Sequence, residues 1–309
     1  MIKDKIIVLG ANGFLGVHLC NTIIKNNYEV IALVRNKKSK NLHKLNKKGI
    51  TVSFIGDLFK KKTFKKKYPN IKYLVNVAAL AHINLENKKK INRLNNLEKN
   101  IIRNFNNKSL NIIHISSSKI INSEQKSNAK VLNPYVRVKV NGEKIISNYY
   151  KNYTILRPAL VYGPEVKANF LSLIKIIYYK IPLPFKFLNN KRSYIYVENL
   201  TSAILHVIKN KHFYGKSYYL CDINNLSTSK LAEIIAKHLS KKVILFYIPY
   251  NLIKVAFMLF RKTDILNKVI GDFIIDNKEF IKDTNWKAPY SLDQGIKKTC
   301  IWYKRRFKL

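Results

Sequence analysis

The sequence predicts an α/β fold: a doubly wound parallel sheet followed by a smaller C-terminal lobe. Short apolar runs alternate with helix-length periodic segments through the first half of the chain. These runs are apolar at nearly every position, which is typical of strands buried on both faces of a parallel sheet. With 309 residues, 47% of them hydrophobic, the chain can bury a core of this size. We expect a first domain over residues 1–160 and a second lobe over residues 161–309, from which some segments return to the first domain.

The first half of the chain contains the predicted sheet. Strand-length apolar runs cover residues 5–9, 29–34, 51–55, 73–77, 110–115 and 154–157. Helical periodicity covers residues 14–25, 88–106 and 135–149. Two neighbouring parallel strands need a crossover connection, and each of these helices can provide one.

The pattern changes after Pro158. Prolines cluster at Pro164, Pro182 and Pro184, and a short strand is predicted over residues 194–197. A helix is expected from Glu198, a strand over residues 217–221 and a helix over residues 227–239 that begins at a serine cap. We place the second, smaller lobe here.

The net charge of +41 raises the question of a polyanionic partner. Of the 58 basic residues only nine are arginine, the residue that nucleic-acid readers favour for its bidentate guanidinium group. The lysines are spread over the whole chain and are not gathered in one stripe. We interpret the charge as a solvated basic surface and expect no specific nucleic-acid site.

The cysteines and the apolar runs indicate the compartment. Cys20, Cys221 and Cys300 are odd in number and far apart, which suits free thiols and gives no metal-binding spacing, so we expect no metal site. The N-terminus runs directly into a strand pattern without a signal peptide, and no apolar run approaches the roughly 20 residues of a membrane span. We therefore expect a cytoplasmic protein without a membrane span. As a separate expectation, the protein forms a homodimer.

A glycine-rich turn predicts dinucleotide binding. Gly10, Gly13 and Gly16 stand between the first strand and the first helix, in the segment GANGFLG. Such glycines let the backbone turn tightly and approach a pyrophosphate, which the N–H groups of the helix N-terminus then bind. We assign these three glycines and Phe14, which follows Gly13, to a cofactor site of the Rossmann type.

The end of the second strand suggests which cofactor is bound. Arg35 stands where an acidic residue would grip the 2′-hydroxyl of NAD, and a guanidinium group there suits the 2′-phosphate of NADP. We expect NADP, with NAD as the alternative. Asp57, just after the third strand, is a candidate for contact with the adenine, and a helix cap is its other interpretation.

A tyrosine and a lysine four residues apart can form a general base. Both lie on one face of a helix, and the ammonium favours the phenolate that would take a proton from a sugar hydroxyl. Three such pairs occur, at Tyr68/Lys72, Tyr135/Lys139 and Tyr250/Lys254.

The surrounding sequence selects Tyr135 and Lys139 among the three pairs. Tyr135 follows the fifth strand, and Ser116, Ser117 and Ser118 stand at the carboxyl end of that strand. This end of a doubly wound sheet faces the ligand crevice, so a serine there can hydrogen-bond the oxygen that the tyrosine deprotonates.

At this point the sequence resembles a known family, the extended short-chain dehydrogenase/reductases of the nucleotide-sugar epimerase/dehydratase type. The resemblance covers essentially the whole chain. It rests on GANGFLG at 10–16, ISSSK at 115–119, PYVRVKVNGEK at 134–144, RPALVYGPEVKANF at 157–170, IPLPF at 181–185, KRSYIYVENL at 191–200 and NWKAPYSLDQGI at 285–296.

The resemblance implies a role for several residues. Tyr135 would be the catalytic base, Lys139 would hold the nicotinamide ribose, and Ser117 would be the supporting hydroxyl. Ser118 is the alternative to Ser117 and would otherwise contact the substrate. Cofactor-lining alanines would be Ala78 and Ala79. The substrate's diphosphate would be held by Asn169 and Arg192.

The resemblance also implies a reaction class. The residues after Ser117 are Ser118 and Lys119, not the Asp-Glu pair of sugar-nucleotide dehydratases, so dehydration is disfavoured. We expect 4-epimerisation or 4-keto reduction of a UDP-sugar in surface-polysaccharide synthesis, and Arg35 slightly favours the reduction. The alternative is a catalytically silent Rossmann-fold regulator that binds a polyanion through its basic surface.

Overall fold

The computed structural model describes residues 4–60, 64, 68, 71–78, 94, 96–121, 133–223, 225–249, 258 and 270–307. The chain divides into two compact units. The first contains Met1–Pro158, Leu200–Leu220 and Lys278–Lys287, and the second contains Ala159–Asn199, Cys221–Asn277 and Ala288–Leu309. The assignment of cofactor binding to one lobe and substrate binding to the other stays a prediction.

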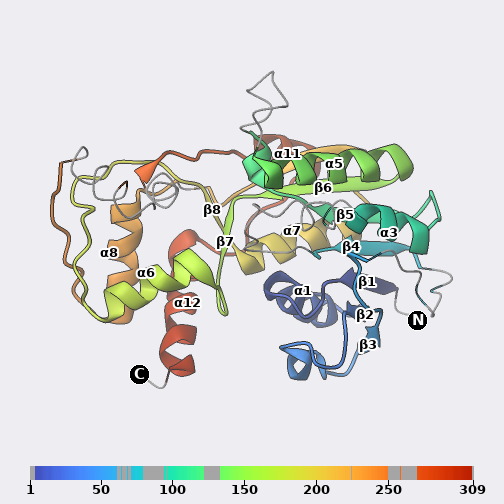
Figure 1. Cartoon of the computed structure of the whole chain (residues 1–309), viewed down its shortest axis with the longest axis horizontal. Helices are drawn as coiled ribbons and strands as arrows, with labels where there is room; N and C mark the ends of the chain where they lie inside the picture. Colours follow the sequence, from blue (N-terminus) through green and yellow to red (C-terminus); the bar gives the residue numbers. More distant parts are fainter. Residues whose placement is uncertain are drawn as a thin grey trace. The chain divides into compact units, whose positions relative to one another are not determined.

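A parallel sheet forms the centre of the first unit, and the predicted doubly wound fold is confirmed (Figure 1). In the described part of the chain it has seven strands in the order β3-β2-β1-β4-β5-β6-β9, and every pairing is parallel. The strands are β1 Lys5–Leu9, β2 Glu29–Val34, β3 Ile50–Phe54, β4 Tyr73–Asn76, β5 Asn111–Ile115, β6 Tyr153–Pro158 and β9 Lys216–Leu220. The order reverses between β1 and β4, which makes the carboxyl ends of these two strands the expected ligand crevice.

Strand β9 comes from the second half of the sequence but completes the first sheet. Its residues pair with β6, with Ile155 beside Ser217 and Leu156 beside Tyr218. Helix α7 (Val197–Asn210) precedes it, and helix α11 (Lys278–Thr284) packs against it. On the same side of β9 as α11, Tyr218 Oη donates a hydrogen bond to Asp283 Oδ2 at 2.7 Å.

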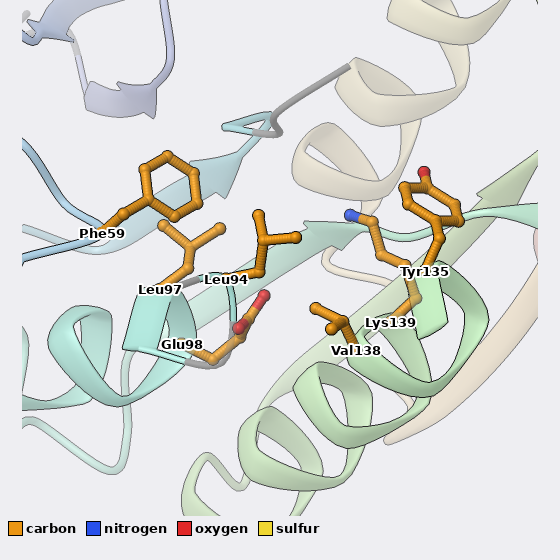
Figure 2. Close-up of a pocket in the computed structure, with 7 residues that line it drawn as sticks. All are labelled: Phe59, Leu94, Leu97, Glu98, Tyr135, Val138 and Lys139. Carbon is orange, nitrogen blue, oxygen red and sulfur yellow. The ribbon is translucent and has the colours of Figure 1, made fainter. Parts of the chain in front are cut away.

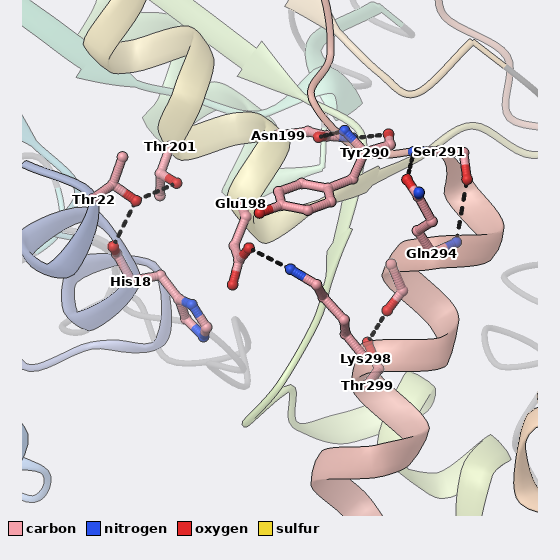
Figure 3. Close-up of polar contacts among 11 residues, drawn as sticks. His18, Thr22, Glu198, Asn199, Thr201, Tyr290, Ser291, Gln294, Lys298 and Thr299 are labelled. Carbon is pink, nitrogen blue, oxygen red and sulfur yellow. Dashed lines mark hydrogen bonds and ion pairs between the residues drawn. The ribbon is translucent and has the colours of Figure 1, made fainter. Parts of the chain in front are cut away.

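Helices cover the sheet of the first unit. Helix α3 (Asn96–Asn104) packs on helix α5 (Pro134–Tyr149), and the core beneath them includes Ile7, Leu74 and Ile112. The predicted helix over residues 88–106 is described only at residue 94 and from residue 96 onward. Helix α1 (Phe14–Lys25) lies beside α7, where the hydroxyls of Thr22 and Thr201 are 2.9 Å apart (Figures 1 and 3).

Among its described residues, the second unit contains a two-stranded parallel sheet and three helices. The strands are β7 Leu160–Tyr162 and β8 Tyr194–Tyr196, and the helices are α6 Ala168–Tyr178, α8 Thr228–Leu239 and α12 Leu292–Arg306. Helix α12 begins with a capping box in which Ser291 and Gln294 bond each other's backbone N–H groups (Figure 3). The ammonium of Lys298 on this helix pairs with Glu198 at 3.2 Å.

A buried carboxylate organises the interior of the second unit. Asp222 accepts hydrogen bonds from the Tyr162 hydroxyl at 3.2 Å, the Tyr196 N–H at 3.0 Å and the Asn199 amide at 2.8 Å. Its side chain is only 3% exposed, and this burial raises the pKa of Asp222 to about 6 even though the three donors act in the opposite direction. No helix formed by the described residues combines the length and apolarity needed to cross a bilayer.

Candidate functional site

The turn after β1 contacts the turn after β4. Gly10 has φ +78°, and a Cβ there would lie 2.8 Å from Ala78 Cα and 2.9 Å from Ala78 N. Its own N–H donates to Leu33 O on β2 at 3.2 Å. Only glycine combines this backbone conformation with so close an approach. Gly10 and the predicted cofactor residue Ala78 therefore lie together at the reversal point of the sheet. Ala79 lies outside the described residues.

Helix α1 starts directly above this turn. Gly13 is its N-cap without a side-chain hydrogen bond, and a Cβ on Gly16 would stand 2.3 Å from Gly10 O and 2.7 Å from Ala11 Cα. Phe14, the first helical residue, is half-buried and meets the His18 ring edge to face at 5.5 Å. The N-terminus of α1 and the backbone of the glycine turn are thus held in the arrangement that suits a pyrophosphate.

The loop after β2 is fastened to the glycine turn. Asn12 donates to Lys40 O, and Asn41 donates to Asn12 O, each at 3.3 Å. Arg35 begins this loop with an exposed side chain, while its backbone O accepts Gly56 N–H at 3.0 Å. The contacts keep Arg35 at the carboxyl end of β2, beside the N-terminus of α1.

Asp57 has a structural contact of its own. It is half-buried after β3, and its Oδ1 accepts the Phe59 N–H at 3.1 Å while its backbone O accepts from Lys60. These bonds define a turn. The predicted contact of Asp57 with an adenine stays a prediction.

Three serines follow β5. Ser116 and Ser118 are buried, whereas Ser117 is half-buried and its Oγ accepts the Lys119 N–H at 3.3 Å, which caps the short 3-10 helix η2 (Ser118–Ile120). Ser117 is therefore the most accessible of the three hydroxyls at this end of the sheet.

Tyr135 and Lys139 occupy the first two turns of α5. Asn133 caps the helix by accepting the Tyr135 N–H at 2.9 Å, and Pro134 fixes its first turn. The ammonium of Lys139 is buried, with the side chain 7% exposed, and donates to Ile115 O at 3.3 Å. This bond ties the lysine to the last residue of β5, immediately before the serines.

The Tyr135 and Lys139 side chains face one pocket within the first unit (Figure 2). The Lys119 ammonium lies 5.5 Å from the centre of the Tyr135 ring. The pocket is lined by Phe59, Leu94, Leu97, Glu98, Tyr135, Val138 and Lys139. Its wall is mostly apolar, and Tyr135, Lys139 and Glu98 are its polar side chains.

Sequence reasoning missed a buried polar group beside this pocket. His114 on β5 and Asn76 on β4 are fully buried, and Glu98 on α3 is 3% exposed. The Nδ2 of Asn76 lies 2.9 Å from His114 Nδ1, and His114 Nε2 lies 3.8 Å from Glu98 Oε1. A polar residue inside an apolar strand run, as in NIIHI and YLVN, is the signal that could have indicated them.

The two predicted diphosphate contacts lie in the second unit. Asn169 is the second residue of α6 and is exposed. Arg192 precedes β8, is half-buried, and donates from Nη1 to Gly271 O at 2.6 Å. Their role toward a diphosphate stays a prediction.

The fold and the site define an α/β protein with a dinucleotide-type turn at the reversal point of its sheet and a Tyr–Lys pair at the carboxyl end of β5. A family model described as the NAD dependent epimerase/dehydratase family matches residues 6–221, and the chain belongs to this family. UDP-glucose 4-epimerase of Vibrio cholerae is 28% identical over 96% of this chain and 95% of its own length. An N-acetyl-α-D-glucosaminyl-diphospho-ditrans,octacis-undecaprenol 4-epimerase of Escherichia coli O157:H7 is 26% identical over 53% of this chain and 55% of its own.

Solved structures share the fold. UDP-glucuronic acid 4-epimerase from Bacillus cereus, in complex with NAD, has a TM-score of 0.73 at 18% identity and covers 98% of this chain and 99% of its own. The Bordetella bronchiseptica enzyme WbmF, in complex with NAD+ and UDP, has a TM-score of 0.73 at 16% identity and covers 99% of this chain and 94% of its own. The predicted epimerase/dehydratase family is confirmed.

Proposed function

We propose that the protein is a nicotinamide-dependent enzyme that interconverts C4 epimers of a UDP-sugar. The observation that carries the proposal is the placement of Tyr135 and Lys139 on successive turns of α5, lining one pocket, with Lys139 bonded to Ile115 O at the carboxyl end of β5. A general base and a cation that line one pocket can remove a proton from a sugar hydroxyl and return it.

The residues at the sheet reversal fit a dinucleotide. Gly10 and Gly16 leave no room for a Cβ, so the turn after β1 packs closely against Ala78 and against the N-terminus of α1, as in dinucleotide-binding turns. Ala78 supplies a small side chain at the end of β4. When bound there, a nicotinamide cofactor would accept a hydride from the C4 carbon and give it back.

The chain's own groups would carry the proton transfers. Tyr135 would take the proton of the C4 hydroxyl when the sugar is oxidised and would return it to the same oxygen when the sugar is reduced. Ser117 donates a hydrogen bond to the C4 oxygen in the ketone state. Lys139 holds the ribose and supplies the positive charge that favours the phenolate.

The relatives support the substrate class. The Vibrio cholerae and Escherichia coli relatives both bear names of 4-epimerases, one acting on UDP-glucose and one on a diphospho-linked sugar. Their common element is a sugar attached to a diphosphate, for which Asn169 and Arg192 are our proposed contacts. A role in polysaccharide precursor synthesis follows as part of the proposal, as does action in the cytoplasm as a homodimer.

The test is an assay of turnover. The purified protein is incubated with UDP-glucose, UDP-N-acetylglucosamine and a UDP-4-keto-6-deoxy sugar, with and without NADPH, and the products are followed by NMR and mass spectrometry. We expect a 4-epimer of equal mass to form without added reductant. Absence of any product, together with retention on anionic polymer, would favour the silent regulator instead.

A second candidate function is 4-keto reduction. The exposed Arg35 at the end of β2, with Lys37 and Lys38 close by in sequence, favours the 2′-phosphate of NADP and hence net reduction. In the same assay, a product two mass units heavier than the keto sugar, formed only with NADPH, would select this function.

A further inference from the structure

Glu98 is a buried carboxylate that the proposed chemistry does not use. It lies on α3 where this helix packs on α5, and a Cβ on Gly142 of α5 would come within 2.8 Å of its Oε1. One carboxylate oxygen, Oε2, is fully buried and has no hydrogen-bond partner among the described residues. The side chain lines the pocket that Tyr135 and Lys139 line (Figure 2).

Hydrogen bonds fix the proton of the neighbouring histidine. The Ala78 N–H donates to Asn76 Oδ1 at 3.1 Å, so the Asn76 amide must present Nδ2 to His114 Nδ1 at 2.9 Å. His114 Nδ1 is then an acceptor, and the ring proton of the neutral imidazole resides on Nε2. Burial lowers the pKa of His114 to about 3, which keeps the ring neutral.

The imidazole therefore turns an N–H toward Glu98. His114 Nε2 lies 3.8 Å from Glu98 Oε1, beyond hydrogen-bond distance, and has no hydrogen-bond partner among the described residues. Hydrogen bonds connect the Ala78 N–H to Asn76 and Asn76 to His114. Among the described residues, the titratable groups that face Glu98 are His114 on β5 and Lys139 on α5.

Stability does not explain a carboxylate at this position. Burial raises the pKa of Glu98, and the Lys139 charge opposes this only in part. An apolar residue would fill the same space against Gly142 without the cost of burying a charge. A residue that costs stability beside a reactive pair is typical of a functional requirement.

Lys139 supplies that requirement, because its ammonium is buried and donates a hydrogen bond to a neutral carbonyl, Ile115 O. A buried cation needs a negative charge nearby. We propose that Glu98 is a positioning residue for the reaction, a counter-charge that acts on Lys139 across the pocket that both side chains line. The inference rests on the proposed function of Tyr135 and Lys139.

The test substitutes Glu98→Gln, which keeps the shape and removes the charge. A negative charge favours the protonated form of its neighbours, so its loss moves the whole pH profile of kcat to lower pH, by about one unit. At a pH one unit above the wild-type optimum, kcat then falls about 10-fold while KM changes less than about 2-fold.

Two matched variants separate the charge from the packing. Glu143 is another buried carboxylate, on α5, and it pairs with Arg157 at 2.7 Å. Glu143→Gln should lower the Tm without moving the pH profile of kcat. Glu98→Asp keeps the charge and should keep the profile even where its shorter chain lowers Tm.

The outcomes separate this inference from the proposed function on which it rests. A Glu98→Gln protein with a lower Tm and an unmoved profile would overturn the proposal, and so would an Asp variant that shifts like Gln. Loss of activity in Tyr135→Phe tests the proposed function separately from Glu98.

Discussion

At the scale of single residues, the proposed function depends most directly on Tyr135. Tyr135→Phe removes the ionisable oxygen and keeps the ring beside Lys119, so turnover should fall at least about 100-fold while cofactor affinity changes little. The assay is epimer formation by NMR together with cofactor titration. Tyr68→Phe is the control, because Tyr68 also stands four residues before a lysine but is bonded to Ser53 at 2.6 Å, and it should keep full activity. Activity of Tyr135→Phe within a few-fold of wild type would refute its role as base.

At the same scale, we expect Arg35 to determine which of the two cofactors is preferred. If its guanidinium holds a 2′-phosphate, Arg35→Ala should weaken NADP(H) about 10- to 100-fold and leave NAD(H) unchanged, since a charge-assisted contact contributes roughly 1.5–3 kcal/mol. Isothermal titration of both cofactors on both proteins measures this. Arg306→Ala, at the exposed end of α12, is the control. Equal wild-type affinities for the two cofactors would contradict the assignment.

At the scale of elements, the contact of α1 with the turn after β1 depends on Gly16. A Cβ there meets Gly10 O at 2.3 Å, so Gly16→Ala must push the helix away from the turn. We expect a loss of about 3 kcal/mol in the free energy of unfolding and a cofactor affinity at least 10-fold lower. Urea unfolding and cofactor titration are the measurements.

Gly49 provides the matching control for Gly16. Unlike the helical Gly16, it has a positive φ, +88°, and a Cβ there meets only Ile24 at an ordinary 3.5 Å. Gly49→Ala should therefore lower the free energy of unfolding by only about 1 kcal/mol, through backbone strain, and leave cofactor binding intact. Similar effects of the two substitutions would show that close packing is not the reason for Gly16.

At the scale of the whole molecule, the two units should respond differently to pH. The folded-state pKa of Asp222, about 6, lies above its ordinary value of 3.8, so the stability it contributes is full below about pH 3.8 and is lost as the pH rises through 6. Between pH 4 and pH 7 the free energy of unfolding of the second unit should fall by roughly 2–3 kcal/mol from this group. Asp222→Asn should abolish that slope.

The tryptophans allow this measurement on one unit at a time. Trp286 belongs to the first unit and Trp302 to the second, and the sequence contains two tryptophans in all. Urea unfolding followed by Trp302 fluorescence in a Trp286→Phe background reports the second unit. The role of Asp222 would be contradicted if the free energy of unfolding in this background rose from pH 4 to pH 7 and rose equally after the Asp222→Asn substitution.

The sequence by itself determined the local structure and much of the proposed site. The strands and helices of the first half follow from the period of their apolar residues. The glycine turn follows from Gly10 and Gly16, which stand at positions where a side chain does not fit. These signals are short-range, because a strand, a helix or a tight turn is specified within a few neighbouring residues.

Tertiary structure decided which distant residues meet. Nothing local to residues 216–220 indicates that this strand pairs with β6. The burial of Glu98 against His114 likewise follows only from the packing of α3 on α5 over the sheet. Long-range pairing and burial depend on how faces fit once elements have formed, and no single segment of sequence contains that information.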